Sequence, residues 1–349
     1  MTTPRVSVVV PCFNLGAYVT EAIESVLAQT FDDVEIIVVN DGSTDQQTND
    51  VLRALRRDRT VVLTTPNHGL PAARNCGIAR SRGEFVCALD ADDRLRPTFL
   101  ERTIGLLDQD PGLAFASSWV QCFGTEDWVW RQDRCDFPAL LAECVVLTAS
   151  PVRRSAFDAV GGYDATRYLY GCEDWDFWIS LVERGYRGAI IPDVLFDYRQ
   201  REGSMRRISE QREVRQRIWE SLLEKHRDTY ARYARDVLLL QEATCGRLLR
   251  ENWDLQFDIE TRLQPRVELL GQERESRGTP PSGGPPKTTS ATGAENRVDE
   301  LTRALSLARA EVQALRASAS WRVTAPLRSA YDVWLSVRAG YSRRRDHQP

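Results

Sequence analysis

The stretch Val6-Ser7-Val8-Val9-Val10-Pro11-Cys12-Phe13-Asn14 is a run of mostly β-branched residues that stops at a proline. Such a run predicts a strand buried on both faces. Apolar runs return at residues 34–39, 61–63 and 85–89, with amphipathic helical segments expected at 17–27, 43–57 and 72–81. This alternation predicts an α/β domain with a mixed, mostly parallel sheet that carries helices on both faces.

Polar segments follow the first, second and fourth of these strands, at residues 11–14, 40–45 and 90–93. Ligands of parallel sheets bind where the strands end. Asp90-Ala91-Asp92-Asp93 places three carboxylates in four residues, and they repel one another unless a cation neutralises them. The pattern favours a hard divalent cation that remains open to substrate phosphates. The alternative is an acidic turn that caps the next helix.

Two further residues are expected near the same edge. Asp41 can accept hydrogen bonds from a base or a ribose, and Gly42 allows a tight turn after it. Arg74, at the start of the third helix, can meet a phosphate or a base. Taken singly, each is equally well explained as loop structure and a solvent-exposed arginine.

The segment Glu173-Asp174-Trp175-Asp176-Phe177-Trp178 opens a predicted helix at about 173–184. A reaction in which a hydroxyl group attacks needs a base that takes its proton, and Asp174 can serve as that base. Trp175 and Trp178 offer aromatic surfaces on which an acceptor ring could stack. Acidic residues at a helix start can also be simple caps and dipole partners, which is the alternative.

Together, and in this order, six segments resemble the family-2 glycosyltransferases of the GT-A fold, of the type that builds bacterial cell-surface polysaccharide. The resemblance covers roughly residues 5–205. It implies inverting transfer in a single displacement from a nucleotide diphosphate sugar to a glycan or lipid-linked acceptor, with Mn²⁺ or Mg²⁺ as cofactor. The segments are residues 11–14, 40–45, 67–75 and 90–92, Gly161-Gly162-Tyr163-Asp164 and Glu173-Asp174-Trp175.

The resemblance also implies roles for single residues. Asp92 would ligate the metal, Asp174 would be the general base with Glu173 as the next candidate, and Trp175 and Trp178 would contact the acceptor. Where many relatives carry a histidine, this chain has Arg199-Gln200-Arg201. Arginine cannot ligate a metal, so Arg199 or Arg201 is expected to neutralise the diphosphate. The donor would be bound by Pro11, Phe13, Asn14, Asp41, Asn67, Arg74, Asp90, Ala91 and Arg201.

Composition excludes other classes of protein. The net charge of −4 argues against a nucleic-acid-binding protein. The eight cysteines form no Cys-x-x-Cys pair and are expected to be reduced and mostly buried. No apolar leader or membrane-length apolar run is found, so the protein is expected in the cytoplasm. His68 is interpreted as loop structure, and His226 and His347 as surface residues.

The expected domains are a catalytic domain at 1–205, a helical extension at 206–270, a disordered linker at 271–297, a short coiled coil at 298–316 and a basic aromatic tail at 317–349. Between Ser276 and Gly293, 15 of 18 residues are Pro, Gly, Ser or Thr, which cannot bury a core. The heptad pattern indicates either a homo-oligomer or a helix docked on its own domain. The tail fits either peripheral contact with the inner face of a membrane or packing on the catalytic domain.

Two competing classes remain. A nucleotidyltransferase is expected to carry a Gly-rich pyrophosphate loop near the first strand, and residues 11–16 lack one. A catalytically weak scaffold that works through its coiled coil would not need Asp90, Asp92 and Asp174 together.

Overall fold

The computed structural model describes residues 3–166, 169, 171–266, 268–269, 303 and 306. The chain divides into two compact units, Met1–Val237 and Leu238–Pro349. The predicted linker and tail lie outside the described residues, and so does the predicted coiled coil apart from Arg303 and Ser306.

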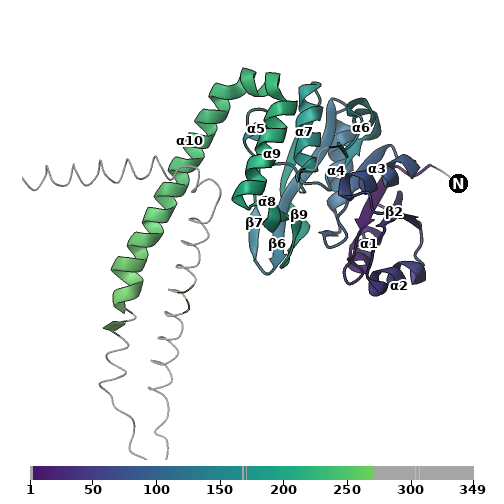
Figure 1. Cartoon of the computed structure of the whole chain (residues 1–349), viewed down its shortest axis with the longest axis horizontal. Coiled ribbons are helices and arrows are strands. Elements are labelled where there is room, and N and C mark those ends of the chain that lie inside the picture. The colour runs from purple at the N-terminus through teal and green to yellow at the C-terminus, as the bar shows by residue number, and fades with distance from the viewer. Residues whose placement is uncertain are drawn as a thin grey trace, which may run out of the picture. The chain divides into compact units, whose positions relative to one another are not determined.

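The first unit is built on one mixed sheet (Figure 1). Its N-terminal half has the order β3-β2-β1-β4, with all neighbours parallel. The order continues β8-β6-β9-β5, and β7 pairs with β6. The long β6–β9 ladder is parallel, whereas the antiparallel ladders of β8, β5 and β7 are short, so the predicted mixed, mostly parallel sheet is confirmed. The strands are β1 (Val6–Cys12), β2 (Val34–Asp41), β3 (Thr60–Thr65), β4 (Phe85–Ala88), β5 (Arg94–Leu95), β6 (Leu113–Gly124), β7 (Trp128–Trp130), β8 (Val152–Arg153) and β9 (Arg187–Gln200).

Helices cover both faces because the side chains of a strand alternate. Val8 and Val10 of β1 join one apolar cluster with α1 (Val19–Leu27) and α4 (Phe99–Gln109). Val9 joins a second cluster with α3 (Leu70–Arg80) and α7 (Glu173–Glu183). Every residue of β1 is buried, as the unbroken apolar run predicts. The remaining helices of this unit include α2 (Gln46–Ala54), α5 (Ala139–Ala142), α6 (Arg154–Val160), α8 (Met205–Ser209) and α9 (Arg212–Lys225).

Gly77 sets the distance between α3 and the sheet. A Cβ atom at this position would lie 2.3 Å from Cγ1 of Val9 and 2.9 Å from Cγ2 of Val39. Contacts that short do not occur, so only glycine lets the helix approach this closely. The close approach places Arg74, one turn earlier, beneath the carboxyl edge of the sheet.

The compact unit extends past the predicted boundary at residue 205. Ile218 and Leu222 of α9, with Tyr230 and Val237 of α10 (Arg227–Asp258), belong to the same apolar cluster as α7. Figure 1 shows α7 between α5 and α6, and it packs against both. The predicted helices after residue 205 are therefore present, but those up to Val237 complete the core of the first unit.

In the second unit the described residues are helical: the rest of α10 and then a short π-helix (Ile259–Leu263). No helix in the described part of the chain has both the length and the apolar character needed to cross a membrane.

Candidate active site

The carboxyl ends of β1, β2 and β4 meet at one edge of the sheet. The register pairs Cys12 with Asn40 and Val9 with Ala88. The loops that follow these strands are therefore neighbours. This is the geometry that the polar segments at 11–14, 40–45 and 90–93 predict.

Asn14 joins the loop after β1 to the loop after β2. Its Oδ1 accepts hydrogen bonds from the backbone N–H groups of Thr44 (2.8 Å) and Asp45 (3.1 Å). Its backbone is left-handed, with φ of 55°, a region that asparagine tolerates better than most residues. Pro11 is buried in β1, whereas the neighbouring Phe13 is 42 % exposed. Of these three predicted donor contacts, Pro11 is buried, whereas Phe13 and Asn14 are exposed.

Asp41 anchors the next loop. Its carboxylate is buried, Oδ1 accepts from the backbone N–H of His68 (3.0 Å), and Oδ2 accepts from that of Gly69 (2.9 Å). The side chain is therefore occupied by the loop, which differs from the predicted open acceptor for a base or ribose. Asn67, in the same loop, is exposed.

Arg74 is buried between two acidic segments. Its side chain is 2 % exposed, its Nη2 lies 2.6 Å from Oδ1 of Asp90, and its Nη1 lies 2.5 Å from Oε1 of Glu173. Tyr163 lies below the guanidinium, whose Cζ is 5.4 Å from the ring centroid. Two carboxylates occupy the guanidinium and only 2 % of the side chain is exposed, so the contact of Arg74 with the donor stays a prediction.

Two arginines contact the carboxylates of the acidic segment after β4, Arg201 through its side chain and Arg199 through its backbone. Asp92 Oδ2 accepts from Nε of Arg201 at 2.6 Å, and the buried Asp93 accepts from the backbone N–H of Arg199 at 2.8 Å. Burial raises the pKa of Asp92, although Arg201 opposes the shift. Burial and the neighbouring carboxylates raise the pKa of Asp93 well above its usual range. Ala91, between Asp90 and Asp92, is fully buried, so its methyl group belongs to the core.

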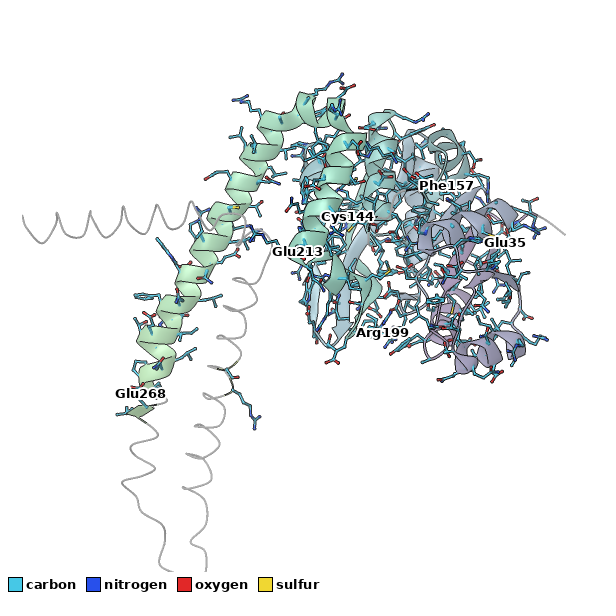
Figure 2. The ribbon with its side chains drawn as sticks, in the orientation of Figure 1. Glu35, Cys144, Phe157, Arg199, Glu213 and Glu268 are labelled. Atoms are coloured by element: carbon cyan, nitrogen blue, oxygen red, sulfur yellow. The ribbon has the colours of Figure 1, made fainter. Side chains whose placement is uncertain are left out.

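The structure distinguishes the two arginines at the end of β9, of which Arg199 lies in the strand and Arg201 follows it. Arg199 (Figure 2) donates from Nε to the carbonyl of Asp92 at 2.8 Å, and its guanidinium lies over the rings of Phe123 and Tyr18. Those contacts hold the loop that contains Asp92 in place. Arg201 instead reaches the carboxylate of Asp92 with a side chain that is 29 % exposed. Arg201 is therefore the one of the pair that can meet a diphosphate at this edge.

The carboxylate oxygens at this edge fit a metal site that is completed by substrate phosphates and water. Within the described residues, no three His, Cys, Asp or Glu side chains gather as a group that could hold a cation. Asp90 and Asp92 offer carboxylate oxygens on side chains that are 27 % and 14 % exposed. Mg²⁺ is usually bound by one or two carboxylates, with substrate phosphates and waters completing its shell. The residues fit that arrangement and do not form a cage made of protein alone.

Asp174 is half-buried in the first turn of α7. Its Oδ2 accepts a hydrogen bond from the hydroxyl of Thr148, a residue that no sequence pattern singled out. Burial and, after it, the charge of Glu173 raise the pKa of Asp174 to about 6. A carboxylate with a pKa near neutrality is suited to general-base work. Glu173 is buried against Arg74, so it is the less accessible of the two.

Trp175 and Trp178 are core residues. Their exposed fractions are 2 % and 0 %. Nε1 of Trp175 donates to the carbonyl of Leu140 at 2.6 Å, and the ring of Trp178 packs on Phe115 with centroids 4.9 Å apart. The prediction that these indoles stack an acceptor sugar is wrong, because neither offers a ring face to solvent.

Other predicted side chains can also be placed. All eight cysteines are free, and four of them are buried. His68 is exposed in its loop. His226 was expected at the surface but is 3 % exposed, with Nε2 lying 3.1 Å from Oδ1 of Asp176. His347 lies outside the described residues.

The N-terminal part of the chain is similar to known glycosyltransferases. Residues 7–163 match the family model of glycosyl transferase family 2. The putative glycosyltransferase EpsH of Bacillus subtilis is 40 % identical over 105 residues, which are 30 % of each chain. The putative glycosyltransferase EpsE of the same organism is 26 % identical over 220 residues, covering 59 % of this chain and 77 % of that protein. The chain thus spans about a third of the length of the first relative.

A solved structure has the same fold. S. aureus TarS 1–349, in complex with UDP-GlcNAc, superposes with a TM-score of 0.50 at 21 % identity and covers 58 % of this chain and 60 % of that one. The sheet and its covering helices therefore have the GT-A fold that the resemblance implies.

Proposed function

We propose, from the match of residues 7–163 to the family model of glycosyl transferase family 2, that this chain transfers a sugar from a nucleotide diphosphate sugar to an acceptor hydroxyl. One observation carries the proposal. Arg74 binds Asp90, on the donor side of the site, and Glu173, next to the candidate base, with its two terminal nitrogens. A single buried guanidinium thus holds the two halves of the reaction centre together.

In the proposed reaction, Asp174 takes the proton of the acceptor hydroxyl as its oxygen attacks the anomeric carbon. The bond from that carbon to the diphosphate oxygen breaks, and the nucleoside diphosphate leaves with the electron pair. The reaction is a single displacement, so it inverts the anomeric carbon. Thr148 donates to Asp174 and orients the carboxylate. Raising the pKa of Asp174 toward neutrality strengthens it as a base.

We propose that Asp92 holds Mn²⁺ or Mg²⁺ together with the donor diphosphate, where the metal would neutralise charge on the leaving group. Arg201, 2.6 Å from Asp92, would meet the same phosphates. Phe13 and Asn67, both exposed at this edge, are the proposed contacts to the nucleoside. Asp41, Asn14 and Arg74 would support them by holding the loops in place.

The acceptor and location are proposed from the sequence. We propose a glycan or lipid-linked acceptor in cell-surface polysaccharide synthesis, used on the cytoplasmic side of the membrane. From Arg316 to the end the chain has seven Arg and two Asp, interspersed with aromatic residues. That composition supports reversible contact with anionic lipid, and the heptads at 298–316 support self-association.

The donor proposal is tested by thermal shift of the purified protein against a panel of nucleotide sugars, with Mn²⁺ and with a chelator. UDP-GlcNAc belongs in the panel because the TarS structure contains it. A metal-dependent shift with one donor, followed by release of its nucleoside diphosphate, is the expected result. No shift and no release with any donor would favour the scaffold that works through its coiled coil.

A further inference from the structure

A buried carboxylate on α7 is held by the turn between α9 and α10. Asp176 lies two residues after the candidate base, and its side chain is 2 % exposed. Its Oδ2 lies 2.7 Å from Nζ of Lys225, and its Oδ1 lies 3.1 Å from Nε2 of His226. Lys225 ends α9, and α10 begins directly after His226. These two residues are called the α9–α10 elbow below.

The elbow also reaches the glycine turn that precedes α7. Nζ of Lys225 lies 2.9 Å from Oδ2 of Asp164, which follows Gly161, Gly162 and Tyr163. Both glycines have positive φ, 87° and 76°, and a Cβ at Gly162 would meet Oδ1 of Asn75 at 2.8 Å. The turn therefore has one shape, which aims Asp164 at the elbow.

The glycine turn is tied in turn to α3. Nδ2 of Asn75 donates to the carbonyl of Tyr163 at 2.7 Å, and the backbone N–H of Tyr163 donates to Oδ1 of Asn75 at 3.0 Å. Asn75 follows Arg74, whose guanidinium binds Glu173 on α7. The contacts thus close a ring that runs from α3 through the glycine turn and the elbow to α7, and from α7 back to Arg74.

The ring provides cationic partners for two buried carboxylates of α7. Glu173 and Asp176 lie in one turn of α7, and their side chains are 4 % and 2 % exposed. The N-terminus of a helix favours negative charge, but buried carboxylates also need cationic partners. Arg74 supplies the partner for Glu173 from one side, and the elbow supplies it for Asp176 from the other. Asp174 lies between the two anchored residues.

We infer that Lys225 and His226 are positioning residues for the candidate base: by binding Asp176 they hold the first turn of α7 so that the Asp174 carboxylate stays against Thr148 and faces the acceptor. The inference rests on the proposed function. It also assigns a role in the reaction to residues that lie beyond the 7–163 family match. The burial of α9 and the start of α10 in the core of the first unit agrees with that role.

The test is Lys225→Met, which keeps the apolar stem and removes the ammonium group. A misplaced reactive group costs up to about 10²-fold in rate, so we expect kcat to fall about 10- to 100-fold with an unchanged donor KM. Arg227→Met, which removes an exposed cation two residues along, is the matched control and should behave as wild type. Lys225→Arg, which restores the charge, should recover most of the rate.

The pH profile separates positioning from loss of folded protein. The Thr148 hydroxyl lowers the pKa of Asp174, so a base that drifts from Thr148 has a higher pKa, and the acid limb of kcat moves to higher pH. A smaller folded fraction lowers kcat without moving the limb, and that result would overturn the inference, as would a wild-type kcat in folded Lys225→Met. The groups that face Asp174 are Glu173 and Cys172 on its own segment, Arg74, Asp90, Cys144 and Tyr163.

Two further measurements keep the inference testable. If Lys225→Met does not fold, Asp164→Asn weakens the same ring while leaving the Lys225–Asp176 pair. A smaller fall in kcat and a smaller movement of the acid limb, also to higher pH, are then expected. If the wild-type protein releases no nucleoside diphosphate from any donor, the proposed function fails. Amide exchange at residues 174–178 still tests whether Lys225 holds the first turn of α7. Faster exchange in Lys225→Met would support the inference, and exchange at the wild-type rate would reject it.

Discussion

Nε of Arg201 lies 2.6 Å from Oδ2 of Asp92, so the carboxylate predicted to bind a cation is paired with an arginine that directly follows β9. The two groups are 109 residues apart in the chain. If a cation bound Asp92 and a diphosphate bound Arg201, each side chain would exchange its present partner for a new one. The charge of Asp92 is therefore already paired within the protein.

That pairing leads to a prediction for Asp92→Asn. The amide loses the charge that attracts a cation, so donor affinity should no longer depend on Mn²⁺ or Mg²⁺. Titration calorimetry of the donor with metal and with chelator measures the difference. Asp193→Asn, at an exposed surface carboxylate, is the control and should keep the wild-type difference. Equal sensitivity to chelator in Asp92→Asn and wild type would remove Asp92 from the metal site.

Asp174→Asn should lower kcat by about 10²- to 10⁴-fold with little change in donor affinity, because only the general base is lost. Steady-state release of nucleoside diphosphate, with donor affinity measured separately, checks both parts. Glu173→Gln should mainly destabilise the protein, since it removes a buried partner of Arg74. A folded Glu173→Gln that is slower than Asp174→Asn would transfer the base role to Glu173.

Activity should fall as the pH drops through about 6, because the pKa of Asp174 is raised to about 6 and only its deprotonated form accepts a proton. At one pH unit below that value, about a tenth of the base is active. Thr148→Val removes a hydrogen bond to the charged form, so its acid limb should move to higher pH. A limb near pH 4 in the wild type, the range of an ordinary aspartate, would argue against this environment.

Trp178→Ala should destabilise the protein by about 3–5 kcal/mol, as large-to-small changes at buried aromatic residues do. Urea unfolding followed by circular dichroism gives the free energy of unfolding. Trp128→Ala is the matched control: this indole is 38 % exposed, lies beside Arg206, and should cost under about 1 kcal/mol. A folded Trp178→Ala of wild-type stability and weakened acceptor affinity would restore the stacking role.

A pair of glycines tests how α3 is placed. Gly77→Ala should destabilise by about 1–3 kcal/mol, because the added methyl group clashes with Val9 and Val39. Gly105→Ala, within α4, meets nothing within 4 Å and should stabilise by about 0.5–1 kcal/mol. Thermal unfolding of both variants measures the contrast. Equal effects would mean that α3 does not approach the sheet as closely as described.

The local sequence was sufficient for the elements and for the edge at which the polar segments meet. Residues 6–10 form a buried strand because four of the five are valine, and the hydroxyl of Ser7 donates to Glu35. The apolar run at 85–89 ends where Asp90 begins the polar segment. Residues 173–183 form the predicted helix, since its apolar residues recur at helical spacing. These features depend on residues that are neighbours in the chain, so a single sequence reveals them.

Only the tertiary structure decided which charges are paired and which side chains are open. Arg74 and Glu173 are 99 residues apart, and Lys225 and Asp176 are 49 apart. From the sequence, an arginine near the edge of a sheet predicts a phosphate ligand. In the fold, two carboxylates contact Arg74 instead. Likewise, the sequence predicts that Trp175 and Trp178 contact the acceptor, whereas in the fold α5 and Phe115 pack against these two residues. Burial and pairing arise from segments distant in sequence, and no local pattern encodes which of them will meet.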